Sequence, residues 1–172
     1  MKGLVHIYCG EGKGKTTAAV GLAVRAAGNG LKVLIVQFLK NGKTGELASF
    51  EKLENITVIR GKGSSKFVWN MNEEEKEAAL LMHTQNLQMV MEASSNYDLM
   101  ILDEAIGACS CGLLEKELLC SFLDKRPEGL EVVLTGRYPA QELLDRADYI
   151  SEIKKIRHPY DKGVMARKGI ER

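Results

Sequence analysis

The chain has 172 residues, of which 45% are hydrophobic and 27% charged, and its formal net charge is +1. This length, at about 100–200 residues per domain, and the even spread of apolar residues exclude a disordered or fibrous protein and predict one domain over residues 1–172. No apolar run approaches the ~18 residues of a membrane span, and the first residues lead into a strand-like run rather than a signal peptide. The four cysteines do not make a disulfide framework, so we expect a cytoplasmic protein without a membrane partner.

The charge is unevenly distributed along the chain. Residues 1–50 carry seven Lys or Arg against two Glu (+5), residues 150–172 carry seven against three acidic residues (+4), and the middle sums to −8. Basic ends around an acidic middle fit a polyanionic ligand held between the termini, and they equally fit solvated surface charge. Charge alone favours neither interpretation.

Hydrophobic patterns alternate between strand and helix. In chain order they predict a strand over 4–8, a helix over 15–27, strands over 32–38 and 56–59, a helix from 72 to about 93, a strand over 97–103, a helix near 115–124, a strand over 130–135, a helix from Pro139 to about 147 and a strand over 149–153. The run 32–38 is apolar without alternation, as in a strand buried on both faces. The pattern predicts an α/β fold with a mostly parallel sheet and helices on both faces.

A glycine-rich loop separates the first predicted strand from the first predicted helix. It comprises Gly10, Glu11, Gly12, Lys13, Gly14, Lys15, Thr16 and Thr17. In this context backbone N–H groups and the helix N-terminus bind phosphate, the lysine reaches phosphate oxygens, and the threonine offers its hydroxyl to Mg²⁺. Cys9 stands where the usual pattern has its first glycine, so the loop is one residue shorter than a standard phosphate loop. The alternative, an ordinary glycine-rich turn, is disfavoured by the strand and helix on either side.

Two other strand ends are expected at the same sheet edge. Asp103 and Glu104 follow an apolar strand, and beside a phosphate loop they are expected to hold Mg²⁺ directly or through water. Arg137 follows the strand over 130–135, where it can neutralise charge on a phosphate leaving group. A surface arginine at a turn explains Arg137 equally well.

The motifs resemble, in order and over nearly the whole chain, those of the P-loop type ATP:corrinoid adenosyltransferases. The resemblance rests on the loop with its first helical turn (10–19), on blocks at 25–30, 37–40, 45–46, 67–69, 101–104, 134–137 and 147–148, and most specifically on RHPYDKGV (157–164) with KGIE (168–171). It implies a three-layer αβα, RecA-like P-loop NTPase fold, usually a homodimer, with ATP bound in reversed orientation and Mg²⁺ beside it.

The reaction that the resemblance implies is displacement at the 5′ carbon of ATP by Co(I) of a corrinoid, with triphosphate leaving, in adenosylcobalamin biosynthesis or salvage. Charge on the leaving oxygen would be stabilised by the loop N–H groups and by a set of candidate residues: Lys13, Lys15, Arg137, and Mg²⁺ on Thr16 and Glu104, with Asp103 as a further metal ligand. No general base is required, because Co(I) is itself a strong nucleophile. An electron-donor protein is an implied partner.

Phe67 and Trp69 resemble the aromatic pair of this family. The resemblance implies that they cover the lower face of the corrinoid and displace its axial ligand, which makes Co(II) easier to reduce, since axial ligation sets a metal's potential. A purely structural interpretation is that the pair tethers a loop to the core. We favour contact with the corrinoid.

Three features depart from the family pattern, and the first two concern the shape of the corrinoid pocket more than the nucleotide site. Residues 64–66 separate Gly63 from Phe67, the chain begins almost at its first strand without the N-terminal extension of longer members, and Arg167 stands where glutamine is common. The preferred corrinoid does not follow from the sequence.

Two other functions are weighed against adenosyl transfer. A small-molecule kinase would require a standard-length loop and an arginine-bearing lid, and a nucleotide-dependent corrinoid carrier would share the motifs yet turn over poorly. Nucleic-acid binding is not expected, because the chain lacks a basic helix and interleaved aromatics. Cys109 and Cys111 lack the second cysteine pair of a zinc site, and His158 has no assigned role.

Overall fold

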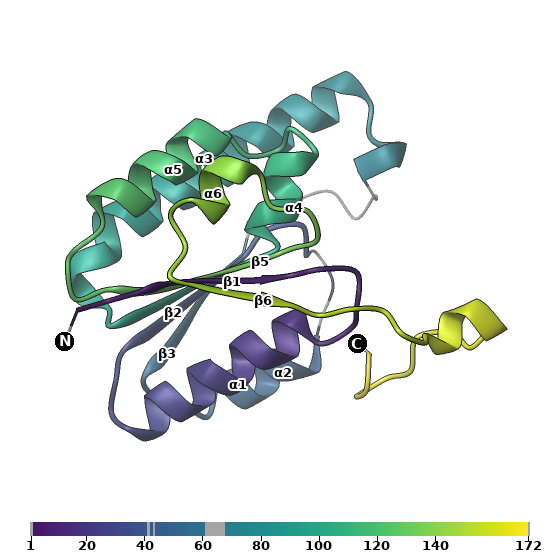
Figure 1. Cartoon of the computed structure of the whole chain (residues 1–172), viewed down its shortest axis with the longest axis horizontal. Helices are drawn as coiled ribbons and strands as arrows, with labels where there is room; N and C mark the ends of the chain where they lie inside the picture. The colour runs from purple at the N-terminus through teal and green to yellow at the C-terminus, as the bar shows by residue number, and fades with distance from the viewer. Residues whose placement is uncertain (1, 41, 43, 61–67, 172) are drawn as a thin grey trace.

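Six strands form one sheet at the centre of the molecule (Figure 1). The computed structural model describes residues 2–40, 42, 44–60 and 68–171. The strands lie side by side in the order β3-β2-β4-β5-β1-β6, and every pairing is parallel. Their bounds are β1 (Val5–Cys9), β2 (Val33–Gln37), β3 (Ile56–Arg60), β4 (Leu99–Asp103), β5 (Glu131–Thr135) and β6 (Tyr149–Glu152). The predicted α/β fold is confirmed, and the sheet is parallel throughout rather than mostly so.

Helices cover both faces of the sheet, which gives the three-layer αβα arrangement. Figure 1 shows helices both below and above the sheet. The lower layer holds α1 (Lys15–Gly28) and α2 (Gly45–Phe50), and the upper layer holds α3 (Glu73–Ala93), α4 (Ala105–Ser110), α5 (Lys116–Lys125) and α6 (Gln141–Leu144). Short 3₁₀ helices are η1 (Val68–Asn70), η2 (Ser94–Asn96) and η3 (Pro159–Lys162).

Each helical layer packs on its own apolar core. All five residues of β2 are buried, as its unbroken apolar run predicts. Because successive side chains of a strand point to opposite faces, Leu34 and Val36 join the core beneath α3, α4 and α5, whereas Val33 and Ile35 join the core against α1 and α2. The sheet is therefore held from both sides.

Several element boundaries differ from expectation. The short helices α2 and α4 were not predicted, and α6 begins at Gln141 rather than in the turn of Pro139 and ends at Leu144. The expected start of α3 is confirmed, since Asn72 and Glu75 form a reciprocal capping box. Within the described ranges, no helix combines the length and hydropathy needed to cross a membrane.

The strand order decides where the site lies. β5 lies between β1 and β4 and pairs with both. The loop that follows β1 and the acidic residues at the end of β4 therefore lie at the same edge of the sheet, on either side of the end of β5. In parallel sheets, ligands bind at this carboxyl edge.

Candidate active site

The glycine-rich loop packs tightly against the segment that follows β6. Gly12 N donates to the Ile153 carbonyl at 2.7 Å, and Gly10 N donates to the Arg137 carbonyl at 3.0 Å. A Cβ atom on Gly10 or Gly12 would lie 2.6 Å from the Ile153 oxygen, closer than real contacts allow. The two glycines are thus required for backbone packing, and their amides bond protein carbonyls. Backbone donors for a phosphate must come from other loop positions.

Lys15, the first residue of α1, folds back onto this loop. Its side chain is 9% exposed, and Nζ donates to the carbonyls of Gly10 at 2.7 Å and Gly12 at 2.8 Å. Burial lowers the pKa of Lys15, the Glu104 carboxylate opposes that shift, and Arg137 adds to it. The charges of Glu104 and Arg137 therefore both influence the Lys15 ammonium.

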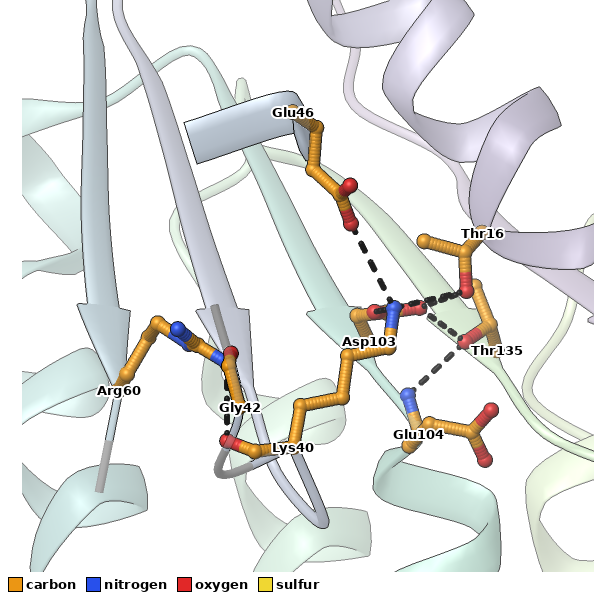
Figure 2. A network of polar contacts seen from close by, with 8 residues as sticks. All are labelled: Thr16, Lys40, Gly42, Glu46, Arg60, Asp103, Glu104 and Thr135. Carbon is orange, nitrogen blue, oxygen red and sulfur yellow. Dashed lines mark hydrogen bonds and ion pairs between the residues drawn. The ribbon is translucent and has the colours of Figure 1, made fainter. Parts of the chain in front are cut away.

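Thr16 and Asp103 meet across the sheet edge, as predicted (Figure 2). Thr16 Oγ1 donates to Asp103 Oδ1 at 2.8 Å, and Thr135 Oγ1, at the end of β5, donates to the same oxygen at 2.8 Å. Asp103 is only 1% exposed. Hydrogen bonds to a buried carboxylate stabilise its charged form and fix its orientation. The two threonines therefore hold Asp103 at a defined place beside the loop.

A lysine that follows β2 completes the surroundings of Asp103. Lys40 Nζ lies 2.8 Å from Asp103 Oδ2 and 3.3 Å from Thr16 Oγ1, with Glu46 Oε1 at 3.8 Å (Figure 2). The turn that carries Lys40 is tied to β3, because Arg60 Nη2 donates to the carbonyls of Lys40 at 3.1 Å and Gly42 at 2.7 Å. Lys40 thus compensates the buried negative charge of Asp103.

Glu104 occupies a backbone conformation that is rare for residues other than glycine. Its φ is +61°, and it is the one non-glycine residue with positive φ in the described part of the chain. The amide of Glu104 donates to Thr135 Oγ1 at 2.9 Å, which holds this conformation. Burial raises the pKa of Glu104, the nearby Asp103 charge adds to the rise, and Lys40, Lys15 and Arg137 oppose it. Unusual backbone geometry of this kind concentrates at functional sites.

An open cleft of about 1130 Å³ extends from the loop. Its cationic lining residues include Lys13, Lys15 and Lys40 from the N-terminal end and Arg167 from the C-terminal end, and Arg137 joins them from the middle of the chain. Residues 158–160, 164–167 and 169–171 form the wall opposite the loop, and Figure 1 shows this tail folding back beyond β6. His158 thus lines the cleft. Within the tail, Arg167 forms a bidentate ion pair with Glu171, and this pairing lowers the pKa of Glu171 to about 2. The two basic ends of the sequence do meet.

The expected aromatic pair is only partly described. Phe67 lies outside the described residues. Trp69, in η1, is 77% exposed and is not among the described residues that line the cleft. Such exposure does not fit a residue that tethers a loop to the core, because a large apolar side chain with that purpose is buried.

The oxygen ligands at the sheet edge fit a divalent cation. Mg²⁺ is usually held by one or two carboxylates together with substrate phosphates, and Thr16, Asp103 and Glu104 supply a hydroxyl and two carboxylates. Among the described residues, no group of three His, Cys, Asp or Glu is placed to hold a metal ion by itself. Oxygens of a bound nucleotide would complete the coordination of a metal ion at this edge.

Sequence reasoning missed several residues of this site. The sequence places Thr135, Lys40 and Glu46 only in family-like blocks, and it assigns no role to Ile153. For Thr135 a signal existed, because a hydroxyl at the carboxyl end of a central parallel strand points to the ligand edge. For Lys40, Glu46 and Ile153 no local pattern shows which residue they meet.

A phosphate loop between a first parallel strand and a helix, with an acidic strand end beside it, defines a P-loop nucleotide-binding protein. The model of the family described as "ATP:corrinoid adenosyltransferase BtuR/CobO/CobP" matches residues 1–172, and the chain therefore belongs to this family. The family match does not favour a kinase or a carrier.

Named relatives agree with this assignment, and a solved structure shares the fold. The chain is 34% identical to the corrinoid adenosyltransferase of Escherichia coli K12 over 170 aligned residues. This alignment covers 99% of this chain and 86% of the relative. The chain is 35% identical, with the same coverage, to the corrinoid adenosyltransferase CobA of Salmonella typhimurium. The crystal structure of the KaiC-like protein PH0186 from Pyrococcus horikoshii superimposes with a TM-score of 0.55 at 18% identity, over 89% of this chain and 72% of that one, and so shares the fold.

Proposed function

We propose that this chain transfers the 5′-deoxyadenosyl group of ATP to Co(I) of a corrinoid. The Co(I) electron pair forms the cobalt–carbon bond, the bond between the 5′ carbon and its oxygen breaks, and its electrons leave with triphosphate. The observation that carries the proposal is the family match over the full length, together with a short glycine-rich loop that shares the cleft with Glu104 and leads into Thr16, which donates to Asp103. The reaction makes one main electrostatic demand, which is to stabilise the charge that develops on the leaving oxygen.

The cations of the cleft meet that demand. An ammonium carries three N–H donors, and the Gly10 and Gly12 carbonyls use two of those of Lys15. We assign the third to a phosphate oxygen, with Lys13 and Arg137 as further cations at the cleft surface. The N-terminus of α1 adds its partial positive charge at the same place. Because Lys15 is buried and held at two points, it needs no reorganisation during the reaction.

We assign Mg²⁺ to the edge formed by Thr16 and Glu104, with Asp103 behind them. When bound, the ion supplies charge that stabilises the triphosphate oxygens. Thr16 and Asp103 are oriented by their mutual hydrogen bond, which fixes their oxygens in advance. The backbone of Glu104 is held by the hydrogen bond from its N–H to Thr135 Oγ1.

The corrinoid is assigned to Trp69 and Phe67, with the cleft serving the nucleotide. The support is the family resemblance, together with the 77% exposure of Trp69, which is not among the described residues that line the cleft. We further propose a homodimer, an electron-donor protein as partner, and a cytoplasmic location, on the basis of the family resemblance.

Product identity tests the proposal directly. The protein is incubated with Mg-ATP and chemically reduced cob(I)alamin, and phosphates and corrinoids are separated by chromatography. Light-sensitive adenosylcobalamin with an equal amount of triphosphate is expected. ADP or phosphate without a cobalt–carbon product would instead support a kinase or ATPase, and a single stoichiometric turnover would support a carrier.

A further inference from the structure

Lys40 lies where two oxygens of the assigned metal site converge. Its Nζ is 2.8 Å from Asp103 Oδ2 and 3.3 Å from Thr16 Oγ1, and Figure 2 shows the ammonium directed at both residues. These two residues also belong to the Mg²⁺ site of the proposed function. An ammonium and a divalent cation therefore need the same oxygens.

Burial makes this overlap energetically significant. Asp103 is 1% exposed and Lys40 has 24% of its side chain exposed, so the pair is shielded from solvent on the carboxylate side. A buried carboxylate without a cation is strongly unfavourable, and two cations a few ångströms apart in such a place repel each other. Either Lys40 or a metal ion can compensate Asp103 well, but both together are disfavoured.

The surroundings of Lys40 allow its ammonium to change partners. Its backbone is anchored by Arg60, while its side chain lines the cleft beside Lys15 and Thr16. A polyphosphate in the cleft offers anionic oxygens to a lysine side chain that can pivot on a fixed backbone. The flexible four-carbon stem of lysine suits such a movement.

We propose that Lys40 is a positioning residue that orders Thr16 and Asp103 before the nucleotide binds and competes with the divalent cation for their oxygens. Metal binding is thereby coupled to nucleotide binding. When the Lys40 ammonium pairs with the polyphosphate, the oxygens of Thr16 and Asp103 become available to the metal ion. This inference rests on the metal site of the proposed function. It makes Lys40 the residue that links binding of the divalent cation to binding of the nucleotide.

Metal binding without nucleotide tests the coupling. Free Mn²⁺ is measured by electron paramagnetic resonance during titration of the wild-type protein and of Lys40→Met, which keeps the stem and removes the charge. The variant is expected to bind Mn²⁺ at least about tenfold more tightly. Lys40→Arg should bind as weakly as wild type, and so should the matched control Lys76→Met, whose lysine pairs with Glu73 on the surface of α3. Adding Thr16→Val to Lys40→Met should abolish the gain.

Equal Mn²⁺ affinity in wild type and Lys40→Met would overturn the proposal. Should Lys40→Met fail to fold, the wild-type protein provides a second measurement: the ¹³Cε NMR signal of Lys40, identified by its loss in Lys40→Arg. This signal should shift on addition of Mg-ATP while that of Lys76 stays, and a Lys40 signal that does not move would also overturn the proposal. Neither measurement uses a corrinoid or turnover, so failure of adenosyl transfer is distinguished from failure of the coupling.

Discussion

Replacing Thr135 with valine should destabilise the protein by removing a buried hydroxyl while keeping its shape. Thr135 is 0% exposed, and its Oγ1 donates to Asp103 Oδ1 and accepts from Glu104 N. Losing a hydrogen bond to a charged group costs about 1.5–3 kcal/mol, and leaving a buried N–H without its acceptor costs about 1–3 kcal/mol. Asp103 Oδ1 retains its bond from Thr16, which limits the first cost. The expected loss in the free energy of unfolding is about 3 kcal/mol.

Urea unfolding followed by circular dichroism measures this loss. With an m-value of about 2 kcal/mol/M, the midpoint should fall by about 1.5 M. Thr135→Ser keeps the hydroxyl and should lose only about 1 kcal/mol for its missing methyl group. Thr57→Val makes the same chemical change at an exposed position of β3 and should stay within about 0.5 kcal/mol of wild type. A Thr135→Val protein within about 1 kcal/mol of wild type, or as unstable as Thr135→Ser, would refute the reasoning.

Three other changes test other parts of the molecule. Burial holds the pKa of His83 at about 4 instead of 6.5. Between pH 6.5 and pH 4 the unfolded chain therefore binds a proton at His83 while the folded chain stays neutral there. The free energy of unfolding should fall by about 3 kcal/mol over this range. His83→Leu should flatten this pH profile in thermal unfolding, and parallel profiles would contradict the assignment. Gly136→Ala would place a Cβ 2.4 Å from Ile106 Cβ and should cost at least about 2 kcal/mol in the same urea assay, whereas the control Gly21→Ala, with open space in α1, should be neutral or stabilising. Trp69→Ala should leave the dissociation constant of ATP unchanged, measured by calorimetry, and slow Co(II) reduction at least about tenfold if axial ligation sets the potential. Weakened ATP binding in this variant would place Trp69 in the nucleotide site instead.

Local sequence patterns determined most of the elements and the position of the loop. The apolar run of β2, the capping box of α3 and the glycine-rich loop before α1 depend on neighbouring residues, so the sequence contains what is needed to find them. The short helices α2 and α4 have no such signal. Residues Ala105, Ile106 and Ala108 of α4 are buried in the core between the upper helices and the sheet, and a helix of this length is stabilised by that packing rather than by propensity.

The meeting of the glycine-rich loop and the acidic residues at one edge also followed from the sequence, because both motifs lie at the carboxyl ends of strands in one parallel sheet. What only the tertiary structure decided is which side chains meet there. Lys40 lies 63 positions before Asp103 in the sequence, and the contact between them exists because β2 and β4 are neighbours. Thr135 reaches Asp103 because β5 lies beside β4, and Ile153 closes on Gly12 because β6 pairs with β1. Hydrogen bonds and ion pairs depend on distances of a few ångströms, and those distances are set by strand order and core packing rather than by any local motif.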